Sequence, residues 1–246
     1  MLRDVPGGGY RFLPGIDPYS SGVIAAPGHE IVHATLRAPV PWRDGFTLID
    51  RHLRAEGQSR AALCAVALRS PTPFTFEGFA EFNAEYREVL AAWGLLVDGA
   101  NPIARTNVAP VVGPPPAPAL YAFAYAVTAA TPRPTFVVAG SGEVDRLNAG
   151  TIVRRGETSP AAMREKAAFV VGVMQTRLGG LGVDWADVTA IDVYTPHPIE
   201  SFVQGTILRA AGAAAVHGVR WYPSQPPIVG LEYEMDLRGI ARELVL

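Results

Sequence analysis

The stretch Phe136-Val137-Val138-Ala139-Gly140-Ser141-Gly142 begins a succession of strand and helix patterns that the chain contains twice. Apolar residues then recur at helical spacing from Ser159 to Leu178, and strict alternation from Leu231 to Leu237 predicts a closing strand. The earlier succession starts at Gly15-Ile16-Asp17-Pro18-Tyr19-Ser20 and contains a predicted helix from Phe79 to Trp93. Both have the order strand, helix, strand, helix, strand, which predicts a duplicated α+β unit.

The boundary between the two predicted copies falls in the turn Thr131-Pro132-Arg133-Pro134. Copy one then covers residues 15–131, and copy two covers residues 132–246. A duplicated fold usually forms its site where the copies meet. The polar residues of both copies are therefore considered together.

Composition favours a folded protein and argues against several functional classes. Hydrophobic residues make up 49% of the 246 residues and charged residues 18%, which suffices for a packed core. A formal charge of −2 and a single lysine, Lys166, argue against nucleic-acid binding. The start, Met1 to Asp4, lacks an apolar signal segment, and no apolar run approaches the roughly 20 residues of a membrane span. We therefore expect a soluble cytoplasmic protein.

Local patterns predict how several segments behave. The first 14 residues, which include a glycine triplet, are expected to form a flexible arm. Prolines between residues 110 and 118 predict a stiff surface loop. Ser159 is expected to cap the long helix of copy two, and Gly179-Gly180 is expected to end it. A further helix is predicted from Ile199 to Ala211.

The closing strand of copy two carries three carboxylates, Glu232, Glu234 and Asp236, on one face. Its other face is apolar. The spacing favours a solvated acidic face, and the alternative is a polar cleft that holds a cation or a proton donor.

Five segments, in order and spacing, together resemble the Rid family of reactive intermediate deaminases, also called YjgF proteins. The segments are Gly15–Ser20, Phe79–Tyr86 with Asn83, Pro102–Thr106 with Arg105, Val138–Glu143 with Ser141 and Gly142, and the acidic strand that leads into Leu237–Ala241. The resemblance implies two tandem chorismate-mutase-like units, each a mixed sheet with helices packed on one face. It also implies a homotrimer with clefts between neighbouring units, and hydrolysis of an enamine or imine to a ketone and ammonia without a metal or organic cofactor.

Neither copy carries the full set of family residues. Copy one keeps Arg105 but has His33-Ala34-Thr35 in place of the serine–glycine step, and aromatic residues in place of the glutamate. Copy two keeps Ser141-Gly142 and has Glu234 or Asp236 at the glutamate position, but its arginine, Arg220, is one position out of register. The two copies complement each other, which predicts a composite site. Two decayed, inactive copies would give the same pattern.

The resemblance assigns a role to each candidate residue. Arg105 is expected to hold a substrate carboxylate, because a guanidinium binds it bidentately and stays charged. Glu234, with Asp236 behind it, is expected to move the proton between water and the leaving nitrogen. The Ser141-Gly142 backbone is expected to approach the substrate closely.

Three further candidates have two readings each. Tyr19 is either a pocket wall or a core residue. Asn83 either contacts the substrate or braces its surroundings. His197, between two prolines, is either a fixed titratable group near the substrate or an ordinary loop histidine.

These assignments predict a deaminase of a small carboxylated enamine or imine. The aromatic residues Tyr121, Phe123 and Tyr125 suggest a longer conjugated substrate, such as a 2-aminomuconate-type dicarboxylate, with one carboxylate on Arg105 and the other on Arg220. A chorismatase-like hydrolase that releases pyruvate is one alternative. A non-catalytic protein that binds small carboxylates is the other.

Overall fold

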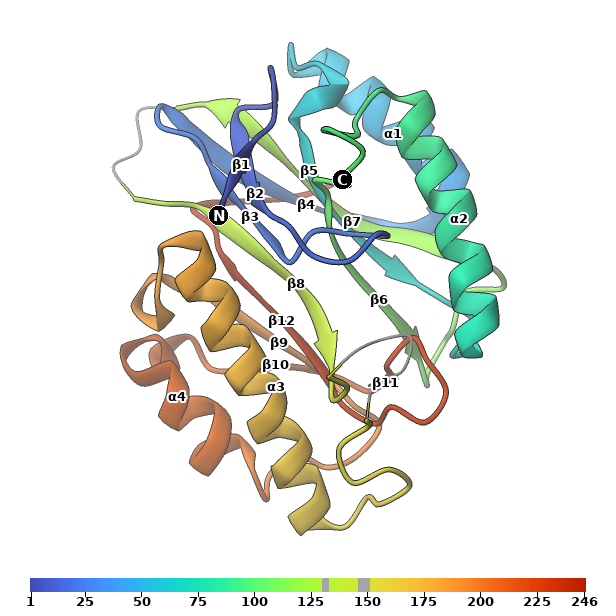
Figure 1. Cartoon of the computed structure of the whole chain (residues 1–246), viewed down its shortest axis with the longest axis vertical. Coiled ribbons are helices and arrows are strands. Elements are labelled where there is room, and N and C mark those ends of the chain that lie inside the picture. Colours follow the sequence, from blue (N-terminus) through green and yellow to red (C-terminus); the bar gives the residue numbers. More distant parts are fainter. Residues whose placement is uncertain (130–132, 146–150) are drawn as a thin grey trace.

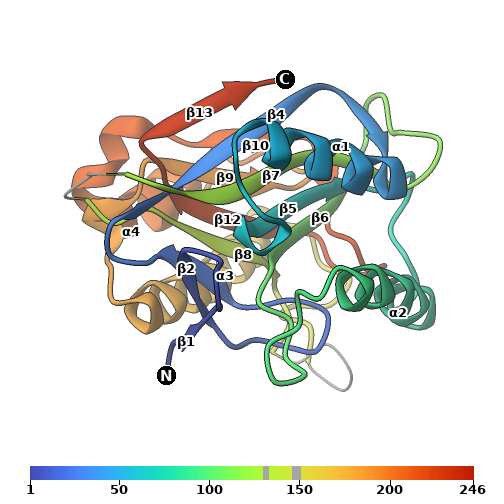
Figure 2. The same cartoon turned by 90° about the horizontal axis from the view of Figure 1, so that it is seen from above.

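The computed structural model describes residues 1–129, 133–145 and 151–246 as a mixed α+β fold with two mixed sheets. Helices α1 (Trp42–Ala55) and α2 (Phe76–Ala92) lie on one side of the strands, and α3 (Pro160–Leu181) and the short α4 (Arg209–Ala211) on the other (Figures 1 and 2). The α+β class predicted from the sequence is confirmed. Within the described ranges, no helix is long and apolar enough to cross a membrane.

The first sheet has seven strands, and each neighbouring pair in it is antiparallel except the last. In spatial order its strands are β1 (Arg3–Asp4), β2 (Tyr10–Leu13), β3 (Gly22–Ala25), β8 (Phe136–Gly142), β12 (Glu234–Gly239), β9 (Ala190–Tyr194) and β10 (Arg220–Tyr222). One face of this sheet packs on α3 through a core that includes Phe136, Val138, Met174, Met235 and Leu237.

The second sheet has six strands, with parallel pairs β5–β6 and β4–β13. In spatial order they are β11 (Ser224–Gln225), β6 (Ala104–Pro110), β5 (Leu63–Arg69), β7 (Ala119–Thr128), β4 (His29–Pro41) and β13 (Arg242–Val245). One face packs on α1 and α2 through residues such as Val66, Phe123, Ile49 and Tyr86. A third core of mainly small residues, including Ala65, Ala104, Ala124 and Ala139, joins the two sheets.

Each sheet contains strands from both halves of the chain. The early strands β2 and β3 extend the sheet built by the second half, and the last strand, β13, extends the sheet built by the first half. The predicted boundary turn lies partly outside the described residues. The division into copies at 15–131 and 132–246 therefore stays a prediction.

The expectation of a flexible N-terminal arm is wrong. Residues in this segment form β1 and β2, and the side chains of Tyr10 and Phe12 are buried. The Tyr10 hydroxyl donates to the Leu63 carbonyl oxygen at 2.8 Å. Gly9 turns the chain with φ 71°, and Gly8 lies so close to the Ala61 carbonyl that a side chain would not fit. The glycines therefore serve a tight turn that docks a strand.

Helix α3 begins as predicted, with Pro160 at its first position and the Ser159 hydroxyl accepting from the Ala162 amide at 3.3 Å. The predicted end at Gly179-Gly180 is wrong, because the helix runs to Leu181 and closes at Gly182, which has φ 80°. Gly180 instead leaves room for the Leu13 side chain against the helix.

The second predicted helix of copy two is irregular rather than a single α-helix. It consists of a π-helical segment (Val203–Leu208), the three residues of α4 and a 3₁₀ segment (Gly212–His217). Two further 3₁₀ turns cover Arg60–Ala62 and Trp185–Asp187. In the first half, α2 begins at Phe76, where the Thr75 hydroxyl caps it, slightly before the predicted start. The proline-rich stretch after Pro110 forms the loop between β6 and β7, as predicted.

The segment after β2 connects the two sheets beside the end of β8. The Ser20 amide donates to the Ile103 carbonyl oxygen just before β6, and the Ser21 carbonyl oxygen accepts from the Ala139 amide of β8. The segment thereby ties the second sheet to the first. The polar residues of β6, β8 and β12 meet beneath it.

Candidate active site

A cavity of about 430 Å³ opens where β6 and α2 face β8, β12 and α3. This volume lies within the roughly 300–1,000 Å³ usual for small-molecule sites. The polar and aromatic side chains in its wall include Tyr19, Phe79, Arg105, Ser141, Arg177 and Glu234. The wall therefore combines residues from both halves of the chain.

Arg105 on β6 is only 2% exposed and is enclosed by aromatic rings. Its guanidinium carbon lies 4.7 Å from the ring centre of Tyr86 and 4.9 Å from that of Tyr19. Nη2 donates to Asn83 Oδ1 at 2.5 Å, while Nη1 is buried without a hydrogen-bond partner in the described part of the chain. The unused donor of a buried cation is available for a carboxylate ligand.

Asn83 braces Arg105 from α2 and does not lie in the cavity wall. Of the two readings open from the sequence, the contacts favour the bracing role. A fixed amide oxygen on Nη2 sets the orientation of the guanidinium plane, so the remaining donors keep one direction. Tyr19 lies in the wall with its ring against Arg105, and so contributes to both the cavity and the aromatic enclosure.

Glu234 on β12 is 4% exposed and lines the same cavity. Burial raises the pKa of this carboxyl well above its usual range, and the nearby Asp236 raises it further, while Arg177 and Arg105 act in the opposite direction. Its Oε1 occupies the space that a side chain at Gly140 would need. The raised pKa favours the protonated form of the carboxyl, which lies against Gly140 and faces the cavity, where it can donate a proton and recover one.

The interpretation of the acidic strand face as solvated is wrong for Glu234 and Asp236. Both are buried because this face of β12 packs toward β6. Asp236 Oδ2 accepts from Thr106 Oγ1 at 2.6 Å and from the Tyr194 hydroxyl at 3.0 Å. Burial, with the charge of Asp192, raises the pKa of Asp236 to about 6. Asp236 lies outside the wall of this cavity, which leaves Glu234 as the carboxyl that faces a ligand.

Ser141 and Gly142 end β8 at the wall of the cavity, where the sequence places them. The Ser141 side chain is half-buried, and Gly142 packs so closely that an added Cβ would meet Leu231. The structure thus brings Tyr19, Arg105, Ser141, Gly142 and Glu234 to one cavity. Their catalytic and binding roles stay predictions.

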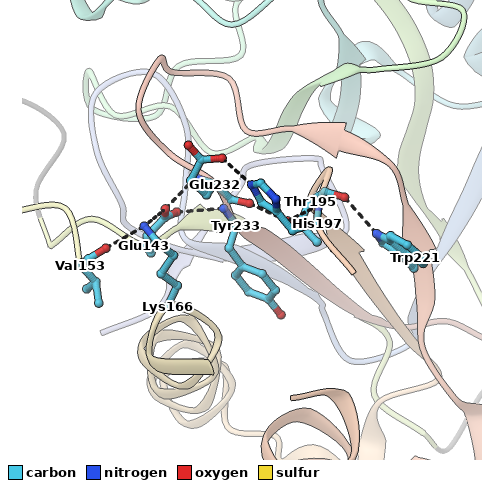
Figure 3. Close-up of polar contacts among 8 residues, drawn as sticks. All are labelled: Glu143, Val153, Lys166, Thr195, His197, Trp221, Glu232 and Tyr233. Carbon is cyan, nitrogen blue, oxygen red and sulfur yellow. Dashed lines mark hydrogen bonds and ion pairs between the residues drawn. The ribbon is translucent and has the colours of Figure 1, made fainter. Parts of the chain in front are cut away.

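The structure does not bring Arg220 or His197 to this cavity. Arg220 is exposed on the edge strand β10, forms an ion pair with Glu243 at 3.5 Å and lines a smaller cavity of about 100 Å³ between the sheets. Arg220 shares the sheet face of Asp192 and Asp236, but β10 is the edge strand and β9 separates it from β12. His197 Nε2 lies 2.8 Å from Glu232 Oε2, outside the wall (Figure 3).

The aromatic residues of β7 do not line the cavity of about 430 Å³ either. Phe123 and Tyr125 pack against His52 of α1 within the core under α1 and α2. The ring centre of Tyr121 lies 4.0 Å from the guanidinium carbon of Arg69. These three residues therefore give no support to a long conjugated substrate in this cavity, although Tyr121 and Phe123 line the smaller cavity between the sheets. The aromatic residues at the cavity are Tyr19, Phe79 and Phe169.

Two buried charged residues, Glu143 and Lys166, hold the start of β12 in place, and no sequence motif gave either of them a role. Glu143 Oε1 accepts from Lys166 Nζ at 3.0 Å and from the Glu232 amide at 2.7 Å, and Oε2 accepts from the Tyr233 amide at 3.1 Å (Figure 3). Both side chains of the Glu143–Lys166 pair are 0% exposed. Because Glu234 follows directly, this pair fixes the backbone that carries the candidate proton donor. The one signal in the sequence is that Lys166 is the only lysine.

Arg177 is a further residue of the site that the motifs did not reveal. It lies on α3 with Phe169 and Val173, all on the helix face that borders the cavity. Its Nη1 donates to the carbonyl oxygens of Ala139 and Gly140 at 2.8 and 3.2 Å. The signal available in the sequence was the spacing of i, i+4 and i+8, beside the apolar stripe that packs on the sheet.

Comparisons with known proteins show the family of this chain. A family model described as 2-aminomuconate deaminase CnbZ matches residues 2–244. The chain belongs to this family. It is 42% identical over 244 residues to the 2-amino-5-chloromuconate deaminase of Comamonas testosteroni, covering 97% of this chain and 96% of the relative. The predicted resemblance to an aminomuconate deaminase is thereby confirmed, whereas the Rid resemblance, the tandem copies and the homotrimer stay predictions.

Solved structures show more distant likenesses. A chorismatase is 13% identical with a TM-score of 0.47, and the match covers 94% of this chain and 75% of that one. A putative endoribonuclease from Thermotoga maritima is 21% identical with a TM-score of 0.33, over 44% of this chain and 80% of that one. Both scores are below 0.5, and neither likeness bears on function. In residues 1–129, 133–145 and 151–246, no group of three or more His, Cys, Asp or Glu side chains is arranged to hold a metal ion.

Proposed function

We propose that this protein is a hydrolytic deaminase that converts a 2-aminomuconate-type dicarboxylate to the corresponding 2-oxo acid and ammonia. One observation carries the proposal: two buried groups line the same cavity. Arg105 has a nitrogen without a hydrogen-bond partner in the described residues, and burial raises the pKa of Glu234. Membership of the aminomuconate deaminase family supports the substrate class.

Arg105 binds the carboxylate next to the carbon that bears the nitrogen. Its Nη1 is buried and has no hydrogen-bond partner in the described residues. Four aromatic rings surround the guanidinium and exclude water from it, namely those of Tyr19, Phe79, Phe82 and Tyr86. An ionic hydrogen bond is stronger in such an environment than in water. Asn83 fixes the rotation of the guanidinium, so the substrate carboxylate is bound in one orientation.

Glu234 moves the protons of the reaction. In the enamine form, a proton must reach the substrate carbon chain to give the imine. Water then adds to the imine carbon, a proton moves to the nitrogen, and the carbon–nitrogen bond breaks, so that imine and water give a ketone and ammonia. A buried carboxyl with a raised pKa begins this sequence as an acid and serves as a base once it has given up its proton.

The test is ammonia release from freshly generated 2-aminomuconate. Wild type is compared with Arg105→Met, Arg105→Lys and Glu234→Gln, and with Arg43→Met as a control at an exposed arginine. We expect loss of turnover of at least about 100-fold for Glu234→Gln, because general acid–base groups contribute about 10²–10⁴-fold. Arg105→Met should mainly raise KM, and lysine should restore part of the binding. Full activity in Glu234→Gln or in Arg105→Met would refute the proposed site.

A further inference from the structure

The cavity contains a second arginine, Arg177, which has no role in the proposed deamination step. Arg105 is held on the side of α2, whereas Arg177 projects from α3, and these helices lie on opposite sides of β6 and β8 (Figure 1). The two guanidinium groups therefore reach the same cavity from different halves of the fold.

Arg177 is anchored on one nitrogen only. Nη1 is bound by the carbonyl oxygens of Ala139 and Gly140, which hold the guanidinium against the end of β8. Nε and Nη2 form no hydrogen bond, and the group forms no ion pair, with any residue that the structure describes. A guanidinium fixed at one nitrogen, with its other donors free, matches the geometry of a carboxylate.

The charges around the cavity leave room for two negative groups on a ligand. The basic and carboxylic residues of its wall are Arg105, Arg177, Glu234 and Asp145. Asp145 is exposed and accepts from the Thr151 amide at 3.0 Å, and burial raises the pKa of Glu234, which disfavours its negative charge. Away from the exposed rim, two guanidinium groups therefore share the cavity with one carboxyl group.

The wall also contains an apolar part suited to a hydrocarbon chain. Phe169 and Val173 come from α3, and the buried side chains of Ile228 and Leu231 come from the segment before β12. A ligand with a carboxylate at each end and an unsaturated chain between them satisfies both arginines and covers these side chains. A monocarboxylate leaves one guanidinium without an anion.

We infer that Arg177 binds the distal carboxylate of the substrate and makes the site selective for dicarboxylates. This inference rests on the proposed function, since Arg105 takes the carboxylate beside the reacting carbon. It replaces Arg220, which lies on an edge strand outside the cavity. Arg177 is thus a specificity-determining residue, and the chemical step itself belongs to Glu234.

The kinetic test uses a pair of substrates that differ only at the distal end, 2-aminomuconate and its 6-methyl ester. Wild type should have the lower KM for the dicarboxylate. In Arg177→Met we expect the KM for the dicarboxylate to rise about 10- to 100-fold, the range of a hydrogen bond to a charged group, while the KM for the ester and both kcat values change little. Arg177→Lys should keep part of the preference. Arg164→Met, on an exposed face of the same helix, is the matched control.

A binding measurement separates failure of this inference from failure of the proposed function. Titration calorimetry compares muconate with its monomethyl ester, neither of which carries an amine to be released. Wild type could show no deamination and still bind muconate more tightly than its monomethyl ester. If Arg177→Met then abolishes this preference, Arg177 does bind the distal carboxylate, and only the proposed reaction is wrong. An equal rise in KM or Kd for diacid and ester in Arg177→Met would show that the residue only supports β8, and would overturn the inference. Unchanged constants would overturn it as well.

Discussion

Replacing Lys166 by methionine removes the ammonium group from a site that excludes water, and leaves the carboxylate of Glu143 behind. Both side chains of this pair are 0% exposed, and Lys166 also donates to the Val153 carbonyl oxygen at 2.8 Å. Methionine is similar in length and apolar, so the change removes charge with little change in volume. Glu143 keeps only the two backbone amides of Glu232 and Tyr233.

The expected cost follows from the burial of this pair. Removing one partner of a buried ion pair destabilises a protein by about 3–5 kcal/mol, because the remaining charge stays desolvated. The Val153 carbonyl loses a donor as well, which places the expected value in the upper half of this range. A whole domain is stable by only about 5–15 kcal/mol. Lys166→Met should therefore unfold at a much lower urea concentration than wild type.

The assay is urea unfolding followed by circular dichroism, with linear extrapolation to water. Glu143→Gln and the double variant Glu143→Gln/Lys166→Met complete a double-mutant cycle. Because the double variant buries no net charge, we expect it to recover part of the stability lost in Lys166→Met. A loss below about 1 kcal/mol in Lys166→Met, or a double variant no more stable than Lys166→Met, would refute the reasoning.

Two further predictions concern the strands around the cavity. Gly140→Ala should lower kcat, because its Cβ would displace the carboxyl end of Glu234 and press on Thr106. Gly172→Ala, in open space on α3, should leave kcat unchanged and raise stability by about 0.5–1 kcal/mol. Steady-state kinetics with unfolding curves test this, and normal kcat in Gly140→Ala would contradict it. Asp236 has a pKa of about 6 in the folded protein against 3.8 ordinarily, so it binds its proton more tightly when folded, and the free energy of unfolding should fall as pH rises between these values. Asp236→Asn should remove this part of the pH dependence in urea unfolding measured from about pH 4 to pH 7, and an unchanged slope would show that another group titrates.

The regular elements could be predicted because their signals are local. Helix α3 is marked by the Ser159 cap, by Pro160 at its first position and by a stripe of apolar residues, and all of these act within a few turns. The same holds for α2 and for the alternating residues before and in β12, although the strand begins at Glu234 and not at the predicted Leu231. Arg105 and Glu234 could be proposed from motifs because each motif is one short continuous stretch of sequence.

The environment of a residue depends on partners that are distant in sequence, and there the predictions were wrong. Alternation at Glu232, Glu234 and Asp236 is the same whether the polar face meets water or another sheet. Only the approach of β6, with the Thr106 hydroxyl on Asp236, decides that this face is buried. Similarly, a glycine-rich N-terminus resembles a flexible arm until the partner strand β3 is in place.

The second arginine shows the limit most clearly. Counting residues along a copy points to Arg220, but this count cannot show that β10 is the edge strand and that β9 separates it from β12. Arg177 belongs to no motif, and its value comes from where α3 crosses the end of β8, which no short stretch of sequence encodes.

The arrangement of the two arginines also explains why both sheets must be assembled before the site exists. Arg105 is oriented by α2 and the second sheet, while Glu234 and Arg177 depend on β12, β8 and α3. Tyr19, on the segment that joins the sheets, contacts Arg105. Burial raises the pKa of its phenol, and the charges of Arg105 and Arg177 act in the opposite direction. Under the proposed function, a ligand with two carboxylates would bind to both assemblies at once, so its binding energy would also stabilise their mutual position. Substrate selectivity and the alignment of the proton donor would then depend on the same contacts.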